Sequence, residues 1–291
     1  NFSSSLSQPI ALNFEFTEAP SAADYLEWDE NGYWTLTMGE YQGTPLVWRM
    51  VLKENEEGTD VSSVANYTQN TTLSGSYYFL LDTYIEDVFN CSFENNYTDS
   101  YPSYTRLDEY KSTVNVNDYA VSNIREYLTG INVYRGYTMS DNTITESFEH
   151  VTQEKEENFL DVFNITDSPV YSLIEGRTLS DLYSRMTDAG SVVKFDTDVE
   201  NGVEGVTGID PDTTKDKLWL LSYYEASKIT MTQGTAADSG ARSWDAKYWL
   251  RSPYSSLTNS VYYVSASGLV GNFSSASYTY CARPAFKISI T

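Results

Sequence analysis

The sequence predicts an α+β fold, because strand-like segments occupy both ends of the chain and helix-like segments lie between them. Alternating and continuous apolar runs, which are typical of half-buried and buried strands, occur before residue 86 and after residue 217. Between them, apolar residues recur at helical spacing beside residues that cap helices. No internal repeat of roughly 20 to 50 residues is present, which argues against a solenoid.

The first expected strand covers residues 8–16, where QPIALNFEF alternates polar and apolar residues before Pro20 and Ser21 end the pattern. We expect residues 1–32 to form an N-terminal strand segment and residues 33–291 to form a single domain. An ordered strand needs an edge to pair with. We favour its own domain, beside the expected C-terminal strand 286–290, over a neighbouring copy joined by strand addition.

Three further strand segments follow in order. The runs WTLTM and PLVWRMVL, between Tyr33 and Leu52, are broken by Gly39 and Gly43, which predicts a hairpin. Residues 77–85, YYFLLDTYI, predict a buried strand. Residues 218–221, LWLL, predict a strand that runs into Ser222-Tyr-Tyr-Glu225, a capping box that opens a short helix.

Three helices are expected in the middle of the chain. Asp118 is expected to cap the first and Gly130 to end it, with one apolar face made of Ala120, Val121, Ile124, Tyr127 and Leu128. The second is expected to begin near Thr152, with Glu154, Glu156 and Glu157 in its first turn and a core face of Phe159, Leu160 and Phe163. The third is marked by Leu179, Leu182, Tyr183 and Met186.

Residues 254–281 contain no charged side chain, although the chain has a formal net charge of −23. We call these residues the uncharged window. Tyr rings interspersed with short hydroxyl and amide side chains are typical of antibody contact surfaces, so the window is predicted to bind a ligand. The expected contact residues are Tyr254, Ser255, Ser256, Asn259, Tyr262, Tyr263, Asn272, Ser274, Ser275, Tyr278 and Tyr280. At least three of the tyrosines are expected in one solvent-facing patch, and the expected inward-facing residues are Val261, Val264, Leu269, Val270 and Phe273.

Four short segments carry a family resemblance: WRM at 48–50, LWLLS at 218–222, YWLRSP at 248–253 and ARPAF at 282–286. Together they resemble a bacterial domain family of unassigned activity, whose pattern is W-R-V-L, L-L-S-x-x-E, W-W-L-R-S-P and V-R-P-A, over residues 39–291. The departures are Met50, Tyr248 and the pair Cys281-Ala282. The family looks like a branch of the C-type-lectin and formylglycine-generating-enzyme fold, so the resemblance implies a C-type-lectin-like single domain. It supplies no catalytic residues.

Some members of that family are variable proteins of diversity-generating retroelements, which mutate adenines. Such mutation of Asn codons cannot produce Lys, Glu, Gln, Met or Trp, and the uncharged window contains none of these five residues. The composition is consistent with diversification. It does not establish it, because ordinary members are also rich in Ser, Asn and Tyr here.

Composition limits the partners. Only 18 basic residues oppose 41 acidic ones, which argues against binding to nucleic acid or anionic membranes. No apolar run reaches the roughly 18 residues of a membrane span. An acidic chain rich in Thr, Ser, Asn and Tyr favours an extracellular or cell-surface location. Cys91 and Cys281 could form a disulfide or remain free buried thiols, and the sequence leaves both open.

Candidate chemistry is sparse. The single histidine, His150, has no accompanying nucleophile motif, and no catalytic residue is expected. The acidic loop with Asp196, Asp198 and Glu200 is the best candidate for a metal, calcium, although a solvated loop is the simpler interpretation. No other cofactor is expected. Arg251 and Arg283 are expected to bind buried carbonyls or an acid and so hold the two ends of the window.

These observations predict an extracellular recognition or adhesion domain that binds a protein or carbohydrate ligand through the uncharged window. The alternative is a structural subunit of an extracellular filament or surface assembly, in which the chain binds copies of itself.

Overall fold

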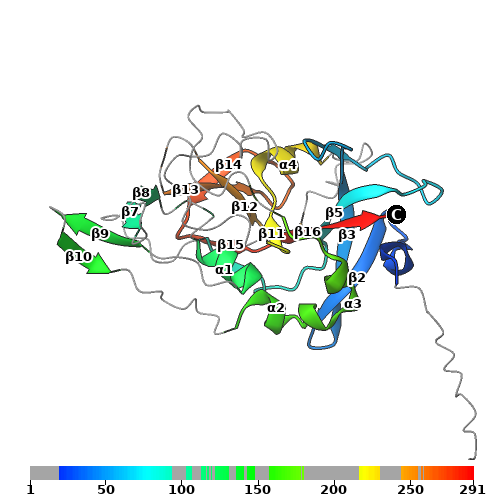
Figure 1. The fold of residues 1–291 in the computed structure, drawn as a ribbon, viewed down its shortest axis with the longest axis horizontal. Helices are drawn as coiled ribbons and strands as arrows, with labels where there is room; N and C mark the ends of the chain where they lie inside the picture. Colours follow the sequence, from blue (N-terminus) through cyan, green and yellow to red (C-terminus); the bar gives the residue numbers. More distant parts are fainter. Residues whose placement is uncertain are drawn as a thin grey trace, which may run out of the picture.

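The computed structural model describes residues 20–93, 103–106, 113–115, 117, 119, 122–130, 136–140, 143–147, 157–177, 179, 216–229, 244–254, 257 and 259–291. Within these ranges the fold is α+β, with most regular residues in three sheets (Figure 1). The expected strand at residues 8–16 lies outside the described residues, so its pairing stays a prediction.

The largest sheet combines strands from both ends of the chain in the order β1-β2-β3-β5-β16-β11, with β4 also paired to β3. Its strands are β1 (Glu27–Trp28), β2 (Trp34–Tyr41), β3 (Thr44–Glu54), β4 (Val61–Ser63), β5 (Gly75–Leu81), β11 (Trp219–Leu220) and β16 (Pro284–Ile290). The central strand β16 pairs along its length with β5, from Ala285 opposite Leu80 to Ile290 opposite Gly75. The last strand of the chain therefore lies in the interior of the sheet that the first strands begin.

A second sheet carries the uncharged window in the order β14-β13-β12-β15-β6. Its strands are β6 (Asn90–Ser92), β12 (Tyr248–Pro253), β13 (Ser260–Val264), β14 (Asn272–Ser275) and β15 (Thr279–Cys281). All are antiparallel neighbours except β12 and β15, which are parallel. Strand β11, the edge strand of the largest sheet, and helix α4 (Tyr223–Lys228) lie beside β12 of this second sheet (Figure 1).

A third sheet, β10-β9-β7-β8, lies at one end of the molecule (Figure 1). Its strands are β7 (Ser103–Arg106), β8 (Thr113–Asn115), β9 (Gly136–Ser140) and β10 (Thr143–Ser147). The remaining short elements are η1 (Ala22–Tyr25), α1 (Asn123–Thr129), α2 (Phe159–Val162), η3 (Ile165–Asp167) and α3 (Pro169–Leu173).

Several expected elements are confirmed. The hairpin forms as β2 and β3, the buried strand as β5, and the 218–221 strand as β11. The capping box also forms, because the Ser222 hydroxyl accepts from the Glu225 amide and the Glu225 carboxylate accepts from the Ser222 amide.

The expected starts of the first two helices are wrong. Helix α1 begins one turn later than Asp118 would place it, because the Ser122 hydroxyl accepts from the Arg125 amide. Gly130 ends this helix as expected, in a left-handed conformation. Helix α2 begins at Phe159 rather than near Thr152, because Asn158 supplies the cap. Leu179 is buried, but the rest of the expected third helix lies outside the described residues.

Two further observations bear on domain limits and location. Strand β1 lies within the expected N-terminal segment and pairs with β2 of the expected domain. Among the described residues, no helix is long and apolar enough to cross a membrane.

The core is rich in aromatic rings. Trp48, on β3, is fully buried, donates its indole N–H to the Met38 carbonyl at 2.8 Å and packs on Phe286 of β16. Phe286 in turn stacks on Phe79 of β5. The landmark Trp48 thus joins three strands of the largest sheet.

Candidate ligand-binding surface

Register divides the side chains of the uncharged window between the two faces of its sheet. Directly paired residues of antiparallel strands point to the same face, and successive residues point to opposite faces. Tyr262 pairs with Phe273, whereas Tyr263 pairs with Asn272 and with Trp249. Adjacent tyrosines therefore contribute to two different surfaces, which the sequence alone does not reveal.

On one face, four rings contact one another in a row. Tyr254 stacks on Phe273 with ring centroids 3.8 Å apart and also contacts Tyr262 at 5.4 Å. Tyr262 contacts Tyr223, the first residue of α4, at 4.7 Å. We call these four residues the aromatic strip. Tyr223 lies outside the uncharged window, and its place beside the window is missed by sequence reasoning.

On the opposite face, Trp249, Tyr263 and Tyr280 form a second aromatic group. The Trp249 and Tyr280 rings are 4.6 Å apart, and the Tyr263 and Tyr280 rings are 4.8 Å apart. The Tyr280 hydroxyl donates to the Ser274 hydroxyl at 3.2 Å. The ammonium of Lys247 lies over both tyrosine rings, so this face has a cation at its edge.

The described part of the chain has four exposed large apolar or aromatic side chains, and all lie in the uncharged window: Leu257, Leu269, Phe273 and Tyr278, which are 47%, 58%, 43% and 60% exposed. Leu269 and Phe273 were expected to face inward. Leu269 instead lies in the turn before β14, and Phe273, which is on the same face as Tyr262, is exposed. Val261 and Val264 are buried as expected, and Val270 is half-buried.

Most of the expected contact residues are only partly exposed. Tyr262 is 7% exposed and so contributes mainly to packing, contrary to expectation. The half-buried residues are Tyr254, Asn259, Tyr263, Asn272, Ser274, Ser275 and Tyr280. Ser255 and Ser256 lie outside the described residues. The buried amide of Asn117 donates to the carbonyls of Leu257 and Ser260, so it holds the loop between β12 and β13.

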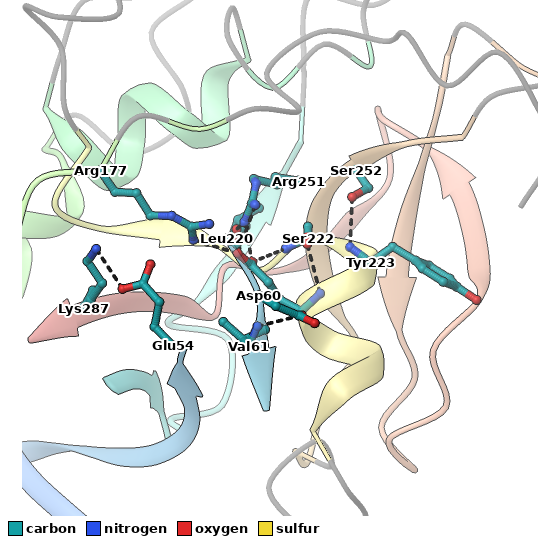
Figure 2. A network of polar contacts seen from close by, with 11 residues as sticks. Glu54, Asp60, Val61, Arg177, Leu220, Ser222, Tyr223, Arg251, Ser252 and Lys287 are labelled. Atoms are coloured by element: carbon teal, nitrogen blue, oxygen red, sulfur yellow. Dashed lines mark hydrogen bonds and ion pairs between the residues drawn. The ribbon is translucent and has the colours of Figure 1, made fainter. Parts of the chain in front are cut away.

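Two of the landmark segments meet in a buried charge network (Figure 2). The Glu225 carboxylate is fully buried and receives hydrogen bonds from Arg251 at 2.5 and 3.1 Å, from Arg177 at 2.7 Å and from the Ser222 amide at 2.8 Å. Arg251 also donates to the Leu220 carbonyl at 2.8 Å. Hydrogen bonds between the L-L-S-x-x-E and W-L-R-S-P segments therefore connect β11, α4 and β12.

The electrostatics of this network favour an ionised Glu225. Burial acts to raise the pKa of Glu225, but the charges of Arg251 and Arg177 and the hydrogen bonds to the carboxylate outweigh it and lower the pKa to about 2. Both ion-pair partners of Glu225 are themselves buried, at 1% and 4% exposure. This carboxylate is thus bound on every oxygen and has no access to a substrate.

Two more buried arginines support the same region. Arg125 of α1 forms a two-pronged ion pair with Asp216, at 2.9 and 2.8 Å. Arg283, in the last landmark, donates to the Leu81 carbonyl at 2.6 Å and lies 3.6 Å from Asp82. The expectation that Arg251 and Arg283 bind inside the protein is confirmed. The roles of Arg125 and Asp216 had no sequence signal, because their partners are distant in the chain.

The two cysteines lie on neighbouring strands but point apart. Both are buried and are not joined by a disulfide in the structure. Tyr280 pairs directly with Cys91, so Cys281, the next residue, points to the opposite face of the sheet. This register opposes a disulfide between Cys91 and Cys281.

The expected metal residues Asp196, Asp198 and Glu200 lie outside the described residues, as does His150. Within the described residues, no group of three or more His, Cys, Asp or Glu side chains could hold a metal ion.

Comparison with known proteins supplies a family but no activity. No curated protein and no solved structure matches the chain. A family model described as a domain of unknown function, DUF6273, matches residues 75–290, which include β5, the charge network, the uncharged window and β16. The match covers well over half of the 291 residues. The chain belongs to the DUF6273 family.

Proposed function

We propose that this chain is an extracellular or cell-surface recognition domain that binds a protein or glycan ligand through the uncharged window. The observation that carries the proposal is the location of the exposed apolar side chains. Leu257, Leu269, Phe273 and Tyr278 all lie within one segment of the described chain. Apolar side chains that gather on a surface, rather than lying singly, are typical of interaction sites.

The finer fold assignment belongs to the same proposal. We infer a C-type-lectin-like domain, in which the terminal strands pair and a loop-rich late segment forms the binding face. The presence of the last strand, β16, in the same sheet as β1 and β2 supports it, as does the separate sheet that carries the window.

A binding role is favoured over catalysis. The uncharged window has no carboxylate, histidine, lysine or arginine. The buried acids beneath it, Glu225 and Asp216, are each ion-paired and at most 1% exposed. Groups held in this way stabilise a scaffold rather than exchange protons with a ligand.

The test is a binding screen of the whole chain against an array of glycans and a panel of extracellular proteins. The matched variants are a triple substitution in the window, Leu269→Ser, Phe273→Ser and Tyr278→Ser, and a control in the first hairpin, Thr37→Ser and Thr44→Ser, where both side chains are exposed. The expected result is binding that the window variant loses and the control keeps. Equal binding by all three proteins would place the site elsewhere.

Sedimentation of the same protein separates recognition from the filament alternative. A monomer with an array ligand supports the proposal, whereas open-ended assemblies that form without any ligand would make self-association the function.

A further inference from the structure

The aromatic strip has the features of a ligand platform in its own right. Its four rings run from α4 across β13 to β14, with contacts of 4.7, 5.4 and 3.8 Å. Tyr262, inside the row, is nearly buried, Tyr223 and Tyr254 are half-buried, and Phe273 is exposed. Rings that are held by a buried neighbour and partly open to solvent offer flat apolar area at little cost in side-chain entropy.

The polar groups along the strip are hydroxyls. Three of its four rings, those of Tyr223, Tyr254 and Tyr262, carry one. Burial, followed by the proximity of Tyr223 and Tyr254, raises the pKa of Tyr262, so this hydroxyl stays protonated at neutral pH. The strip therefore presents neutral donors and acceptors beside ring surfaces.

We propose that the aromatic strip binds a neutral glycan chain and that Tyr223, which lies outside the uncharged window, is part of the binding site. Pyranose rings present C–H groups that pack on aromatic faces, and their hydroxyls match phenol hydroxyls as hydrogen-bonding partners. The inference rests on the proposed function and narrows it to one ligand class.

Charge and composition select this occupant. No charged side chain occurs in the window, so a charged ligand would lose its hydration without gaining a counter-ion from it. The eight Ser of the window and the phenol groups of its Tyr residues supply neutral hydroxyls instead, which are the same hydrogen-bonding groups that a glycan presents. A neutral, hydroxylated ligand therefore fits this composition.

The buried charge network positions Tyr223 for this role. Its amide donates to the Ser252 hydroxyl at 2.9 Å, and the adjacent Ser222 is bound to Glu225, which Arg251 holds. Figure 2 shows the ring of Tyr223 extending away from the network. At its far end, a Cβ added at Gly271 would lie 3.5 Å from the Tyr223 hydroxyl, so the turn before β14 packs against it.

The experiment measures binding of the whole chain to neutral hexasaccharides by calorimetry, with cellohexaose, mannohexaose and chitohexaose as probes and heparin and polygalacturonate as charged comparators. Binding of at least one neutral probe, and of neither comparator, is expected. Binding should persist in EDTA, because rings and hydroxyls need no cation. If no neutral probe binds, or if EDTA abolishes binding, the inference is wrong.

Single substitutions then locate the site. Phe273→Ala is expected to weaken binding about tenfold through loss of a ring, and Tyr223→Phe about fivefold through loss of one hydroxyl. Thr37→Ser is the control, because Thr37 is exposed on β2 and lies outside the window. It should change binding less than about twofold. Tyr278→Ala removes a 60% exposed window tyrosine that has no ring contact with the strip among the described residues, so it separates the strip from the rest of the window.

Two results would separate the inference from the proposed function. Loss of glycan binding in Tyr278→Ala but not in Phe273→Ala or Tyr223→Phe would overturn the strip as the site while leaving the window as a recognition surface. A protein ligand that depends on the window, with no glycan ligand, would overturn the inference alone. Binding that is insensitive to every window substitution would overturn both.

Discussion

Two adjacent regions of this protein, the buried charge network and the uncharged window, reverse the usual location of charged side chains. In most proteins charged side chains lie at the surface and are rare in the interior. Here Arg125, Arg177, Asp216, Glu225 and Arg251 are nearly or fully buried. The surface segment that follows Arg251 has no charge over 28 residues. The two regions are neighbours in sequence, since Arg251 is in β12 and the window begins at Tyr254.

The difference shows how one domain can combine a buried network whose residues cannot be changed with a surface segment whose residues can. Each charged group in the network needs partners at fixed positions, and removing one partner leaves a buried charge unpaired. The hydroxyls and amides of the window can also be satisfied by water, so their substitution leaves no such penalty. We therefore expect stability to depend on the network and ligand preference to depend on the window.

The strongest way to break this comparison is Arg251→Ala. The substitution leaves the buried Glu225 carboxylate with one arginine instead of two and frees the Leu220 carbonyl. The expected loss in the free energy of unfolding is about 3 to 5 kcal/mol, measured by urea denaturation. Lys228→Ala is the control, because Lys228 pairs with Asp60 at 3.7 Å with 37% and 48% exposure and should cost about 1 kcal/mol or less. Equal losses would mean that the buried ion pairs of the network stabilise the fold no more than an exposed ion pair does.

A nearly equal loss is expected for Trp249→Ala. Trp249 is fully buried, and its indole N–H donates to the Cys91 carbonyl at 3.0 Å. Its ring packs against the Tyr263 and Tyr280 rings on the face of the window sheet opposite the aromatic strip. Removal of such a side chain costs about 3 to 5 kcal/mol. Thermal unfolding should show this loss, and Trp28→Ala, at the half-buried edge strand β1, should show a clearly smaller one. A loss near zero for Trp249→Ala would mean that Trp249 does not support the window.

Acid should weaken the network before it affects the window. The pKa of Glu225 lies near 2 in the folded protein and at 4.5 as the ordinary value. The stabilisation from its ionised form is therefore complete above about pH 4.5 and is lost as the pH falls toward about 2. Glu225→Gln should be less stable than the wild type at pH 7, and the gap measured by denaturation should narrow as the pH falls through this range. A gap that does not change with pH would mean that Glu225 is not ionised in the fold.

Sequence reasoning predicted the parts of the fold that depend on local pattern. The apolar runs identified β2, β3 and β5, and Ser222 with Glu225 identified the start of α4, because strand burial and helix capping are encoded within a few residues. The starts of α1 and α2 were misplaced because Asp118 and Ser122, or Thr152 and Asn158, are equally good caps in isolation.

The candidate site was predictable as a segment but not as a surface. Absence of charge identified residues 254–281, yet the face of each residue depends on register, which the pairing of β13 with β14 sets. That pairing turns Phe273 outward beside Tyr262 and brings in Tyr223 from a segment more than 25 residues before the window. A contact between distant segments, such as Arg125 with Asp216, leaves no local signal at all.

A smaller effect is expected from the thiols. Because the register places Cys91 and Cys281 on opposite faces, we expect both to react with a thiol reagent after unfolding without prior reduction. A reducing agent should leave the midpoint of thermal unfolding unchanged. A mass lower by two hydrogens, or a lower midpoint after reduction, would show a disulfide and hence a different register between β6 and β15.

The smallest effect should come from the window itself, and it sharpens the comparison most. Tyr278→Ser changes a side chain that is 60% exposed, and surface substitutions of this kind usually alter the free energy of unfolding by less than about 0.5 kcal/mol. Tyr262→Ser is the same substitution at another tyrosine of the window. It should lower the free energy of unfolding several times more, because the Tyr262 ring is 7% exposed and packs on Tyr223 and Tyr254. Urea denaturation of the two variants side by side measures the contrast. If Tyr278→Ser were as destabilising as Tyr262→Ser, the exposed residues of the window would contribute to stability as its buried ones do. The proposed separation between a stabilising network and a tolerant window would then be wrong.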